Sequence, residues 1–432
     1  MADIKKVLDK MIEQIKEKGA DSGQVFVTES EDTEFNAEHG ELSLLRTLFN
    51  QDINLIVYKD QKKGSYFSNK LDDASIDHGV SMAMTSMESC KQDEAYGIIA
   101  PYQGEITANK GVYEPDTDLL FKRMKELLDD IKEHHPLIIV QEMIISHHRR
   151  HMVFANTNGT TCDEYTGFYT VSLVIAGHQG DITTSMNGCG FQLINLDEPW
   201  TENEYIKRKI RYTEGQIAMK PIEQSFTGTM ILTPDCLAMF LYYIIGLVEG
   251  AAILEKTSIW LTKLQQQVAD PKITIRLDPN DTNVLCGETI TIDGFKSEGY
   301  DIIKEGNLVR FCINHYVAKK TGYEMRGNGA YNLMITPGEE SIDDIIKRID
   351  HGILVDGFSG GQPPVNGDFS GVAKNSYLIE NGKITKPVTE AMINGNLAAM
   401  LMELEGISSE VLKDGCNMIP YMAFRGILVS GK

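Results

Sequence analysis

The sequence predicts an α+β protein of two domains. Its 432 residues exceed what one hydrophobic core usually supports, and a hydrophobic content of 42% is ample for two folded cores. Strand patterns do not alternate regularly with crossover helices, which favours α+β over a doubly wound parallel sheet. We place an N-terminal α+β domain at 1–222, with a possible subdivision near 100–115, and a β-rich C-terminal α+β domain at 223–432.

Hydrophobic periodicity and turn signals predict the elements of the first domain. Apolar residues at helical spacing from Ile4 to Ile15 predict an amphipathic surface helix. Lys220-Pro221 ends the last helix of the domain, because proline cannot continue it. Between them the patterns predict helices at 73–89, 116–133 and 202–219, strands at 24–28, 54–58, 65–67, 137–145, 152–155 and 165–175, a Gly/Pro-rich connector at 101–115, and a hairpin turn at Asn156-Thr157-Asn158-Gly159.

The second domain is expected to begin with a strand and a buried helix. Thr233-Pro234-Asp235 has the form of a helix start, with proline at the first helical position, and the helix should run to about Gly250. The remainder is predicted to be mostly short strands and turns. The strands are expected at 229–232, 289–292, 307–312 and 331–335, and two further helices at 341–349 and 394–405.

Charge and hydropathy exclude two classes of partner. The chain has 41 basic and 62 acidic residues, a formal charge of −21, which opposes binding to a phosphate backbone. No window approaches 18 uninterrupted apolar residues, and the richest, 237–254, is broken by Gly246, Glu249 and Gly250. We therefore expect neither a nucleic-acid partner nor a membrane span.

The N-terminus and the cysteines indicate a cytoplasmic protein. The first residues interleave charges with apolar side chains, so the continuous apolar core of a secretory signal is missing. Seven cysteines form no CxxC pair, and an odd count is typical of a reduced protein.

The densest group of candidate metal ligands is His147-His148-Arg149-Arg150-His151. On a helix, His147 and His151 would share a face and could bind zinc. The surrounding pattern predicts strand, turn and strand instead, and two arginines raise the cost of placing a cation there. We therefore favour a polar, solvent-facing segment.

Three further motifs lack a part that their chemistry needs. Residues 278–283 resemble half of a calcium loop but have neither its central glycine nor its terminal glutamate. Gly327-Asn328-Gly329 has no phosphate-loop lysine, and Ser359-Gly360-Gly361 does not complete the GxSxG of a nucleophile elbow. The first two are predicted to be turns.

Residues 360–401 contain glycines that determine the shape of the backbone, but few reactive side chains. They contain no Cys or His, and their glycines stand where turns need positive φ. Such a segment predicts the wall of a cleft rather than a catalytic centre. Our candidate substrate-cleft residues are Asn366, Gly367, Asp368 and Ser370.

The same segment carries a family resemblance. Val365-Asn366-Gly367-Asp368-Phe369-Ser370-Gly371, followed by Ile379-Glu380-Asn381-Gly382-Lys383-Ile384 and Gly395-Asn396-Leu397, resembles the TldD/PmbA family. The turn at Asn156–Gly159, the stretch 293–299 and the ending from Cys416 are similar to further family landmarks in the same order, so the resemblance spans nearly the whole chain. It implies a two-domain fold with mixed and antiparallel sheets and flanking helices.

The resemblance also implies a cytoplasmic, two-subunit zinc peptidase that cleaves unfolded peptides. In the family, TldD-like chains carry the zinc on an HExxxH helix and a C-terminal cysteine, and PmbA-like chains, also called TldE-like, complete the assembly. Here Tyr242-Tyr243-Ile244-Ile245-Gly246-Leu247 lies over HExxxH, so both histidines and the catalytic glutamate are missing, and Cys416 stands at the third-ligand position without partners.

The expected function is therefore a PmbA/TldE-like subunit with no catalytic or metal-binding residues of its own. It would pair with a TldD-like chain, which holds the zinc, or with itself.

Two other functions remain open. A self-sufficient metallopeptidase would need unorthodox ligands drawn from His147, His151, His315, His351 or Cys416. A protein-binding regulator without a proteolytic role would match the family's older description as a modulator of DNA gyrase. Metal analysis of the purified chain distinguishes the first from a non-catalytic subunit.

Overall fold

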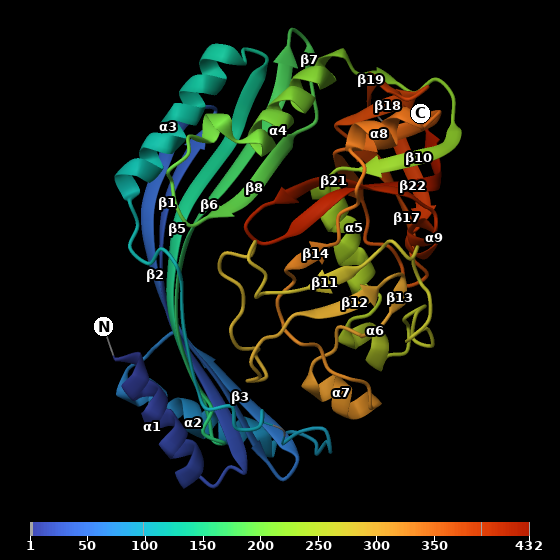
Figure 1. Ribbon diagram of the computed structural model, residues 1–432. Coiled ribbons are helices and arrows are strands. Elements are labelled where there is room, and N and C mark those ends of the chain that lie inside the picture. Colours follow the sequence, from blue (N-terminus) through green and yellow to red (C-terminus); the bar gives the residue numbers. More distant parts are fainter. Residues whose placement is uncertain (1–2, 98, 390, 432) are drawn as a thin grey trace.

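The computed structural model describes residues 3–97, 99–389 and 391–431. Two β-rich units lie side by side, as Figure 1 shows. The N-terminal unit, blue to green, is a long curved sheet with helices at its ends, and the C-terminal unit, yellow to red, lies on the concave side of that sheet. The predicted α+β fold class, with mixed and antiparallel sheets, is confirmed.

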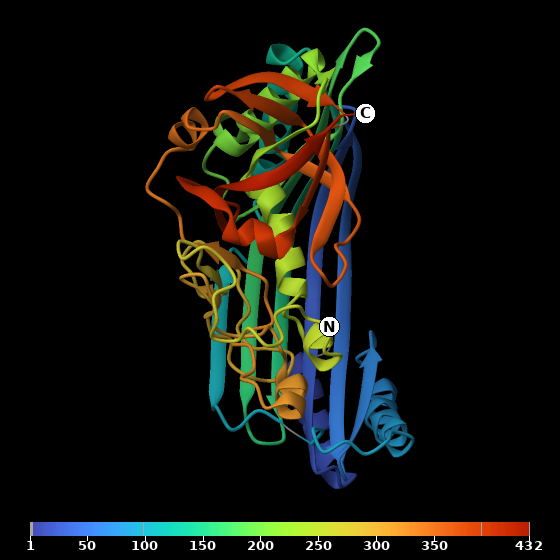
Figure 2. The same cartoon turned by 90° about the vertical axis from the view of Figure 1, so that its right-hand side faces the viewer.

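Four strands of 17 to 19 residues form most of the N-terminal sheet. They pair antiparallel in the order β2-β1-β5-β6, with β3 outside β2 and the parallel strand β4 outside β6. At about 3.3 Å per residue each long strand spans roughly 60 Å, so the sheet runs the length of the molecule (Figure 2). The bounds are β1 (Ser22–Glu38), β2 (Glu41–Lys59), β3 (Lys62–Ser68), β4 (Glu105–Gly111), β5 (Ile138–Asn156), β6 (Thr161–Gln179), β7 (Ile182–Thr183) and β8 (Asn187–Leu193).

Helices cover the two ends of this sheet. α1 (Ile4–Glu17) and α2 (Asp73–Glu88) bury apolar side chains of β1 and β2 at one end, and α3 (Thr117–His134) does the same for β5 and β6 at the other. Each helix begins after an aspartate whose carboxylate accepts a hydrogen bond from a backbone N–H of the first turn, at Asp3, Asp72 and Asp116.

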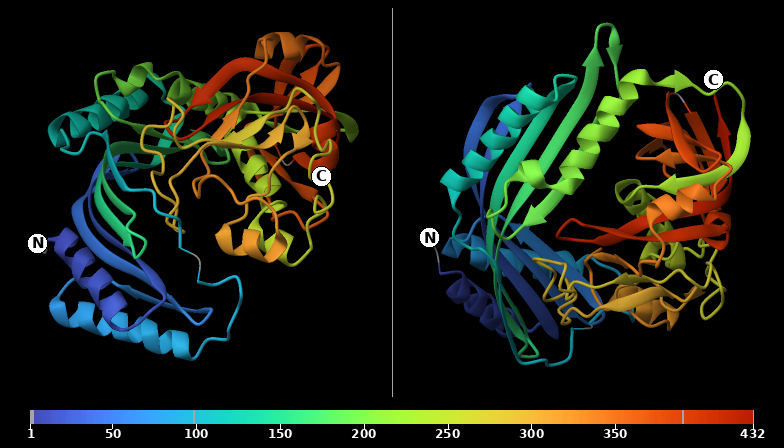
Figure 3. Two further views of the ribbon diagram at one scale, coloured as in Figure 1. Left: turned by 60° about the horizontal axis from the view of Figure 1, so that its bottom comes forward. Right: turned by 45° about the horizontal axis from the view of Figure 1, so that its top comes forward.

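The chain then crosses to the C-terminal unit. The connecting elements are η1 (Trp200–Glu202), α4 (Glu204–Gly215) and η2 (Gln216–Ala218). Figure 3 shows α4 running along the junction between the two units. The following strand, β9 (Lys220–Pro221), already belongs to the C-terminal sheet, where it pairs with β19.

A mixed sheet surrounds one apolar helix in the C-terminal unit. The main path of this sheet runs β13-β12-β11-β14-β22-β10-β15-β18-β19-β9. α5 (Pro234–Gly246) packs against it and buries Phe240, Leu241 and Ile244 in the largest core cluster. The remaining bounds are β10 (Phe226–Leu232), α6 (Gly250–Leu254), β11 (Ile275–Leu277), β12 (Tyr300–Lys304), β13 (Asn307–Leu308), α7 (His315–Thr321), β14 (Leu333–Ile335), α8 (Ile342–Lys347), β15 (His351–Val355), β16 (Gly357–Gly360), β17 (Asp368–Lys374), β18 (Ser376–Glu380), β19 (Lys383–Thr389), β20 (Ala391–Asn396), α9 (Leu397–Met402), β21 (Leu404–Lys413) and β22 (Met418–Ser430).

Several predictions along the chain are wrong, among them the connector expected at 101–115, which contains the strand β4. The strands expected at 137–145 and 152–155 are one continuous strand, β5, because the polar run between them pairs with β1 and β6 instead of turning. The strand expected at 289–292 is only an isolated bridge between Ile290 and Lys296.

The helix expected from 394 begins at Leu397. Residues 394–396 extend β20, and the Asn396 side chain accepts hydrogen bonds from the N–H groups of Ala398 and Ala399, which starts the helix there.

None of the helices described is suited to span a membrane. Among residues 3–97, 99–389 and 391–431, no helix has the length and apolar character needed to cross a bilayer.

The contact between β3 and α2 requires a glycine at position 64. A β-carbon there would collide with the carbonyl oxygen of Ala83 and stand 2.8 Å from Cβ of Met87. We expect Gly64→Ala to lower the free energy of unfolding by about 1–3 kcal/mol, because it forces the helix away from the strand. Urea denaturation measures the change. The control is Gly190→Ala on β8, where the nearest atom would lie 3.8 Å away; equal losses in both variants would contradict the prediction.

Candidate functional site

The helix α5 carries the positions that the family resemblance places over the zinc motif. Its apolar face is buried, whereas Tyr242 is 44% exposed and Tyr243 is half-buried. Leu247 follows the last helical residue and is buried in the core. At the position of the first histidine of HExxxH, the phenol of Tyr242 therefore faces the surface. At the position of the second histidine, the side chain of Leu247 packs in the core.

Tyr331, from a distant segment, meets Tyr242 and is itself bonded to Glu249. The rings of Tyr242 and Tyr331 make an edge-to-face contact with centroids 6.2 Å apart. The Tyr331 hydroxyl donates a hydrogen bond to the Glu249 carboxylate. Burial, together with this bond, raises the pKa of Tyr331 to about 12, so the phenol remains protonated at neutral pH.

Asp414 and Cys416 lie near Tyr242. Burial raises the pKa of Tyr242, and the negative charge of Asp414 raises it further. The Cys416 N–H donates to Asp414 Oδ1 at 2.8 Å, and its carbonyl accepts from Asn332 Nδ2 at 3.0 Å. The fold thus brings together the helix and the C-terminal cysteine that the resemblance pairs.

The residues around Tyr242 and Cys416 do not fit a zinc ion. Burial raises the pKa of the Cys416 thiol to about 12, and Asp414 and Cys286 add to the shift, so no thiolate is available at neutral pH. Glu249 is engaged by Tyr331, and tyrosine and leucine replace the two imidazoles. Within the described ranges no three His, Cys, Asp or Glu side chains are grouped so that they could hold a metal.

Residues 362–371, which we call the cassette loop, lie beside the end of α5. Pro363, Pro364 and Val365 share a small hollow of about 90 Å³ with Tyr243 and Gly246. On its other side the loop borders an open hollow of about 480 Å³, lined by Gly361, Gln362, Pro363, Pro364, Asp368, Phe369, Ser370, Asn394 and Gly395.

The four candidate cleft residues have different positions in this loop. Asp368 and Ser370 line the open hollow. Asn366 and Gly367 shape the turn that leads to it: Gly367 has φ of +83°, and Asn366 Nδ2 donates to Asp368 Oδ2 at 2.7 Å. Asn396 Nδ2 donates to the other Asp368 oxygen at 2.8 Å, so the carboxylate is fixed at the rim of the hollow.

The predicted solvent-facing histidine segment is instead a ladder of pairs within the N-terminal sheet. His147 is almost fully buried and its Nε2–H donates to the Val112 carbonyl at 2.7 Å. His148 bonds Asp32 at 2.6 Å, and Arg149 bonds Glu31 and Glu114.

The second half of the segment continues the pattern. Arg150 bonds Glu164 at 2.6 Å, and His151 bonds Asp163 at 2.8 Å while its ring stacks on Tyr165. The expected turn is wrong, because residues 147–151 lie within β5 and pair with β1 and β6. The expected exposure to solvent holds only in part, since Arg150 is exposed but His147 is buried.

The other histidines proposed as unorthodox ligands are dispersed. His315 starts α7 and stacks on Phe295, and His351 starts β15 on the surface beside Asp350. With His147 and His151 on β5 and Cys416 after β21, these residues occupy four separate regions of the fold.

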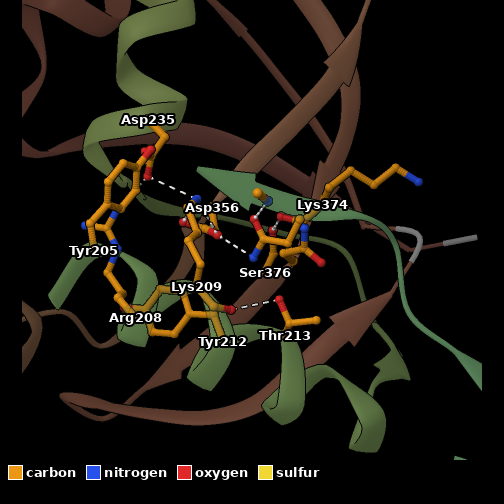
Figure 4. Close-up of polar contacts among 12 residues, drawn as sticks. Tyr205, Arg208, Lys209, Tyr212, Thr213, Asp235, Asp356, Lys374 and Ser376 are labelled. Carbon is orange, nitrogen blue, oxygen red and sulfur yellow. Dashed lines mark hydrogen bonds and ion pairs between the residues drawn. The ribbon is translucent and has the colours of Figure 1, made fainter. Parts of the chain in front are cut away.

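A buried ionic cluster joins the two units, and sequence reasoning missed it. We call Arg208, Lys209, Asp235 and Asp356 the interdomain clamp (Figure 4). Lys209 Nζ lies 3.0 Å from Asp356 Oδ2 and 3.1 Å from Asp235 Oδ2, and Arg208 donates to Asp235 at 2.5 Å. Lys209 and Arg208 come from α4, Asp235 from the first turn of α5, and Asp356 from the end of β15.

The clamp is nearly closed to water. Lys209 is 1% exposed and Asp356 is 3% exposed. Burial acts to lower the pKa of Lys209, but the charges of Asp356 and Asp235 outweigh it and raise the pKa, so the ammonium stays charged. Asn187 Nδ2 from β8 donates to Asp356 at 2.9 Å. These contacts join α4 to α5 and to the end of β15, so they hold the two units together.

One signal for the clamp was present in the sequence. Lys209 lies at helical spacing with Ile206, Ile210 and Thr213, all buried, so a lysine occupies the apolar face of a helix. A buried lysine needs a counter-ion, but its partner Asp356 is 147 residues away.

Comparisons with known proteins relate the whole chain to one family. The model described as "PmbA/TldA metallopeptidase C-terminal domain" matches residues 225–431, and "PmbA/TldA metallopeptidase domain 1" matches 23–86. A metalloprotease PmbA of Escherichia coli O157:H7 is 23% identical over 94% of this chain and 93% of that protein. A metalloprotease TldD homologue of Haemophilus influenzae is 29% identical over 38% of this chain and 36% of that protein.

Solved structures share the fold along the full chain. TldE from Thermococcus kodakarensis gives a TM-score of 0.89 at 21% identity, covering 98% of this chain and 100% of that one. A protein from Bacteroides thetaiotaomicron described as a modulator of DNA gyrase gives 0.86 at 22% identity, covering 100% of both chains.

We expect a large loss of stability when the charge of Lys209 is removed from the clamp. Lys209→Met keeps most of the side-chain volume but leaves Asp356 buried without a counter-ion, while Asp235 keeps Arg208, and we expect the free energy of unfolding to fall by about 3–5 kcal/mol. Guanidinium denaturation provides the measurement. In the control, Lys207→Met on the exposed face of α4, little change is expected; similar losses in both variants would rule out the clamp as the cause.

Burial of His147 predicts a pH dependence of stability. Burial lowers the pKa of His147 below 6.5, so the unfolded chain takes up this proton before the folded chain does. The contribution of His147 is therefore fully present above pH 6.5 and is lost as the pH falls towards the folded-state pKa. NMR titration of the His147 ring should give a midpoint below 6.5. A midpoint at or above 6.5 would contradict the assignment.

Proposed function

Because this chain belongs to the PmbA/TldD family of metallopeptidases, we propose that it is a non-catalytic, PmbA/TldE-like subunit of a cytoplasmic zinc metalloprotease that cleaves unfolded peptides. A TldD-like chain with an intact HExxxH helix supplies the zinc in this assembly. The present chain completes the protease and forms part of the wall that guides the peptide.

The replacement of the zinc motif is the observation that carries the proposal. Tyr242, Tyr243 and Leu247 stand where two ligands and a general base are needed, and Leu247 is committed to the core. A zinc peptidase needs three protein ligands, a free position for water and a base. The phenols of Tyr242 and Tyr331 and the protonated Cys416 thiol supply none of these.

The cassette loop supports a role in peptide positioning. It borders the open hollow lined by Asp368 and Ser370, close to the end of α5. Pro363 and Pro364 have no backbone N–H, so this part of the loop resists pairing as a strand and keeps its shape as a wall.

The cysteines support a reducing compartment. All seven cysteines are free, at positions 90, 162, 189, 236, 286, 312 and 416. A cytoplasmic assembly of this chain with a TldD-like chain is consistent with that state.

The proposal predicts that neither zinc nor activity is found in the lone chain. The experiment purifies the chain alone, a TldD-like relative alone, and the two mixed, and measures zinc by metal analysis and hydrolysis of an unfolded peptide. We expect the lone chain to hold no stoichiometric zinc and to show no hydrolysis, and the mixture to exceed the relative alone. A chelator should abolish the activity of the mixture.

A matched variant separates the roles of the two cysteines. Cys416→Ala in this chain should leave the zinc content and activity of the mixture unchanged, whereas the equivalent change in the TldD-like chain should remove both. Chelator-sensitive hydrolysis by the lone chain would instead establish the self-sufficient metallopeptidase. Recovery of a gyrase subunit with this chain, and of no TldD-like protein, would favour the regulator.

A further inference from the structure

We propose that a pocket between the two units binds a free α-amino acid with a small apolar side chain. We call it the junction pocket. Its hollow of about 150 Å³ is lined by, among others, Tyr58, Lys63, Tyr96, Asp293, His315 and Tyr316. Figure 1 shows the corresponding place in the fold, where α7 lies beside the end of the N-terminal sheet that carries β3. The inference concerns the chain by itself and is independent of the proposed function.

The N-terminal sheet supplies one wall of the junction pocket. Tyr58 of β2 and Lys63 of β3 are direct partners in the antiparallel register, so their side chains stand next to each other on one face of the sheet. Gly64, the next residue of β3, contacts α2 on the opposite face. Tyr58 and Lys63 therefore point away from α2 and towards the C-terminal unit.

Three tyrosine rings from separate segments follow one another along the pocket. Tyr96 lies between the other two, with its ring centroid 6.4 Å from that of Tyr58 and 5.1 Å from that of Tyr316. The Tyr316 hydroxyl donates to Asp93 Oδ2 at 2.8 Å, and Lys320 Nζ lies 2.8 Å from Asp93 Oδ1, so this carboxylate already has a counter-ion. The rings offer apolar contact, and their faces attract an ammonium group.

The Asp293 carboxylate is positioned by a turn that is anchored on the N-terminal unit. The buried side chain of Gln24 on β1 donates to the Ile292 carbonyl at 2.7 Å. Gln103 Nε2 donates to the Gly294 carbonyl at 3.1 Å, and Gly294 has φ of +82°. Both neighbours of Asp293 are thus held by side chains of the other unit, which fixes the carboxylate in place before a ligand arrives.

Asp293 and Lys63 bring opposite charges to the pocket without pairing with each other. Among the described residues, the Asp293 carboxylate accepts one hydrogen bond, from the His315 backbone N–H at 3.4 Å, which is long. The Lys63 ammonium has neither an ion pair nor a hydrogen bond within the part of the chain that the structure describes. Burial lowers the pKa of His315, so its ring supplies no counter-charge at neutral pH.

These two charges select the class of ligand. A simple organic cation would be repelled by Lys63, and a simple anion by Asp293. A zwitterion satisfies both, because its ammonium pairs with Asp293 and its carboxylate pairs with Lys63. A hollow of about 150 Å³ is too small for a drug-sized molecule, and the zwitterion that fits it is a single amino acid.

The uncharged wall of the pocket complements the rest of such a ligand. Burial raises the pKa of Tyr58 to about 12, and the charge of Asp293 adds to the shift, so the phenol stays protonated and can donate to a carboxylate. The rings of Tyr96 and Tyr316 remain for an apolar side chain.

Isothermal titration calorimetry on the full chain tests the proposal, with L-alanine, L-valine and L-leucine as probes. We expect saturable, one-to-one binding of at least one of them. The amide of the tightest-binding probe lacks the carboxylate, and its N-acetyl derivative lacks the ammonium. Each should bind about 10-fold or more weakly, because a charge-assisted hydrogen bond is lost. Absence of binding for all three amino acids, or equal binding of either derivative, would overturn the proposal.

Matched variants assign the binding to the two charges. Asp293→Asn and Lys63→Gln should each weaken binding of the tightest probe by about 10–100-fold. The controls are Glu298→Gln, an exposed residue of the same segment, and Lys62→Gln, whose ammonium bonds the Glu88 carbonyl at the end of α2. Both controls should bind as the unmodified chain does, and circular dichroism checks that all four variants are folded. Equal losses in the controls, or unchanged binding by Asp293→Asn, would contradict the assignment.

Thermal unfolding provides a second readout. A ligand that binds only the folded chain raises its unfolding temperature with increasing concentration. The tightest probe should therefore raise the unfolding temperature of the unmodified chain and of Glu298→Gln, but not that of Asp293→Asn. A rise of the same size in Asp293→Asn would place the amino acid elsewhere and overturn the proposal.

Discussion

One buried charge, the ammonium of Lys209, sets the geometry on which the rest of the structure depends. It is held between Asp356 and Asp235, and a misplacement of either carboxylate would leave an uncompensated charge in a nearly dry interior. The pairing of Lys209 constrains the direction from which each carboxylate approaches, as well as its energy. Only one arrangement of α4 against the C-terminal sheet lets both oxygens reach the same nitrogen, so the clamp fixes the relation of the two units where apolar packing alone would tolerate a small slide.

The two carboxylates of the clamp also begin the two arms of the candidate cleft. Asp235 lies in the first turn of α5, whose far end carries Tyr242 and Tyr243. Asp356 lies between β15 and β16, and β16 leads directly into the cassette loop. The positions of the helix and of the loop are therefore tied to the same ion cluster. The helix and the loop are thus held in place by residues that lie outside the candidate cleft.

An element could be predicted from the sequence where the residues that determine it are adjacent in the chain. The start of α5 at Thr233-Pro234-Asp235 and the hairpin at Asn156–Gly159 were predicted correctly, because capping and turn chemistry are contained in a few adjacent residues. The first half of β2 was not predicted, because residues exposed on both faces show no alternation. The run from His147 to His151 suggested a turn because the partners of those side chains lie on other strands. The division at 222 and the four cleft residues remain predictions.

The pairing of β22 has a consequence for biosynthesis. β22 lies in the interior of the C-terminal sheet and pairs with β10, β14, β20 and β21, so this sheet cannot close until β22 has left the ribosome. Lys209 must likewise wait for Asp356, which is made 147 residues later, a delay of roughly 7–30 s at typical rates of translation. During that interval the nascent N-terminal sheet carries an unpaired cation and an uncovered concave face. The protein is therefore expected to depend on chaperones that shield nascent chains.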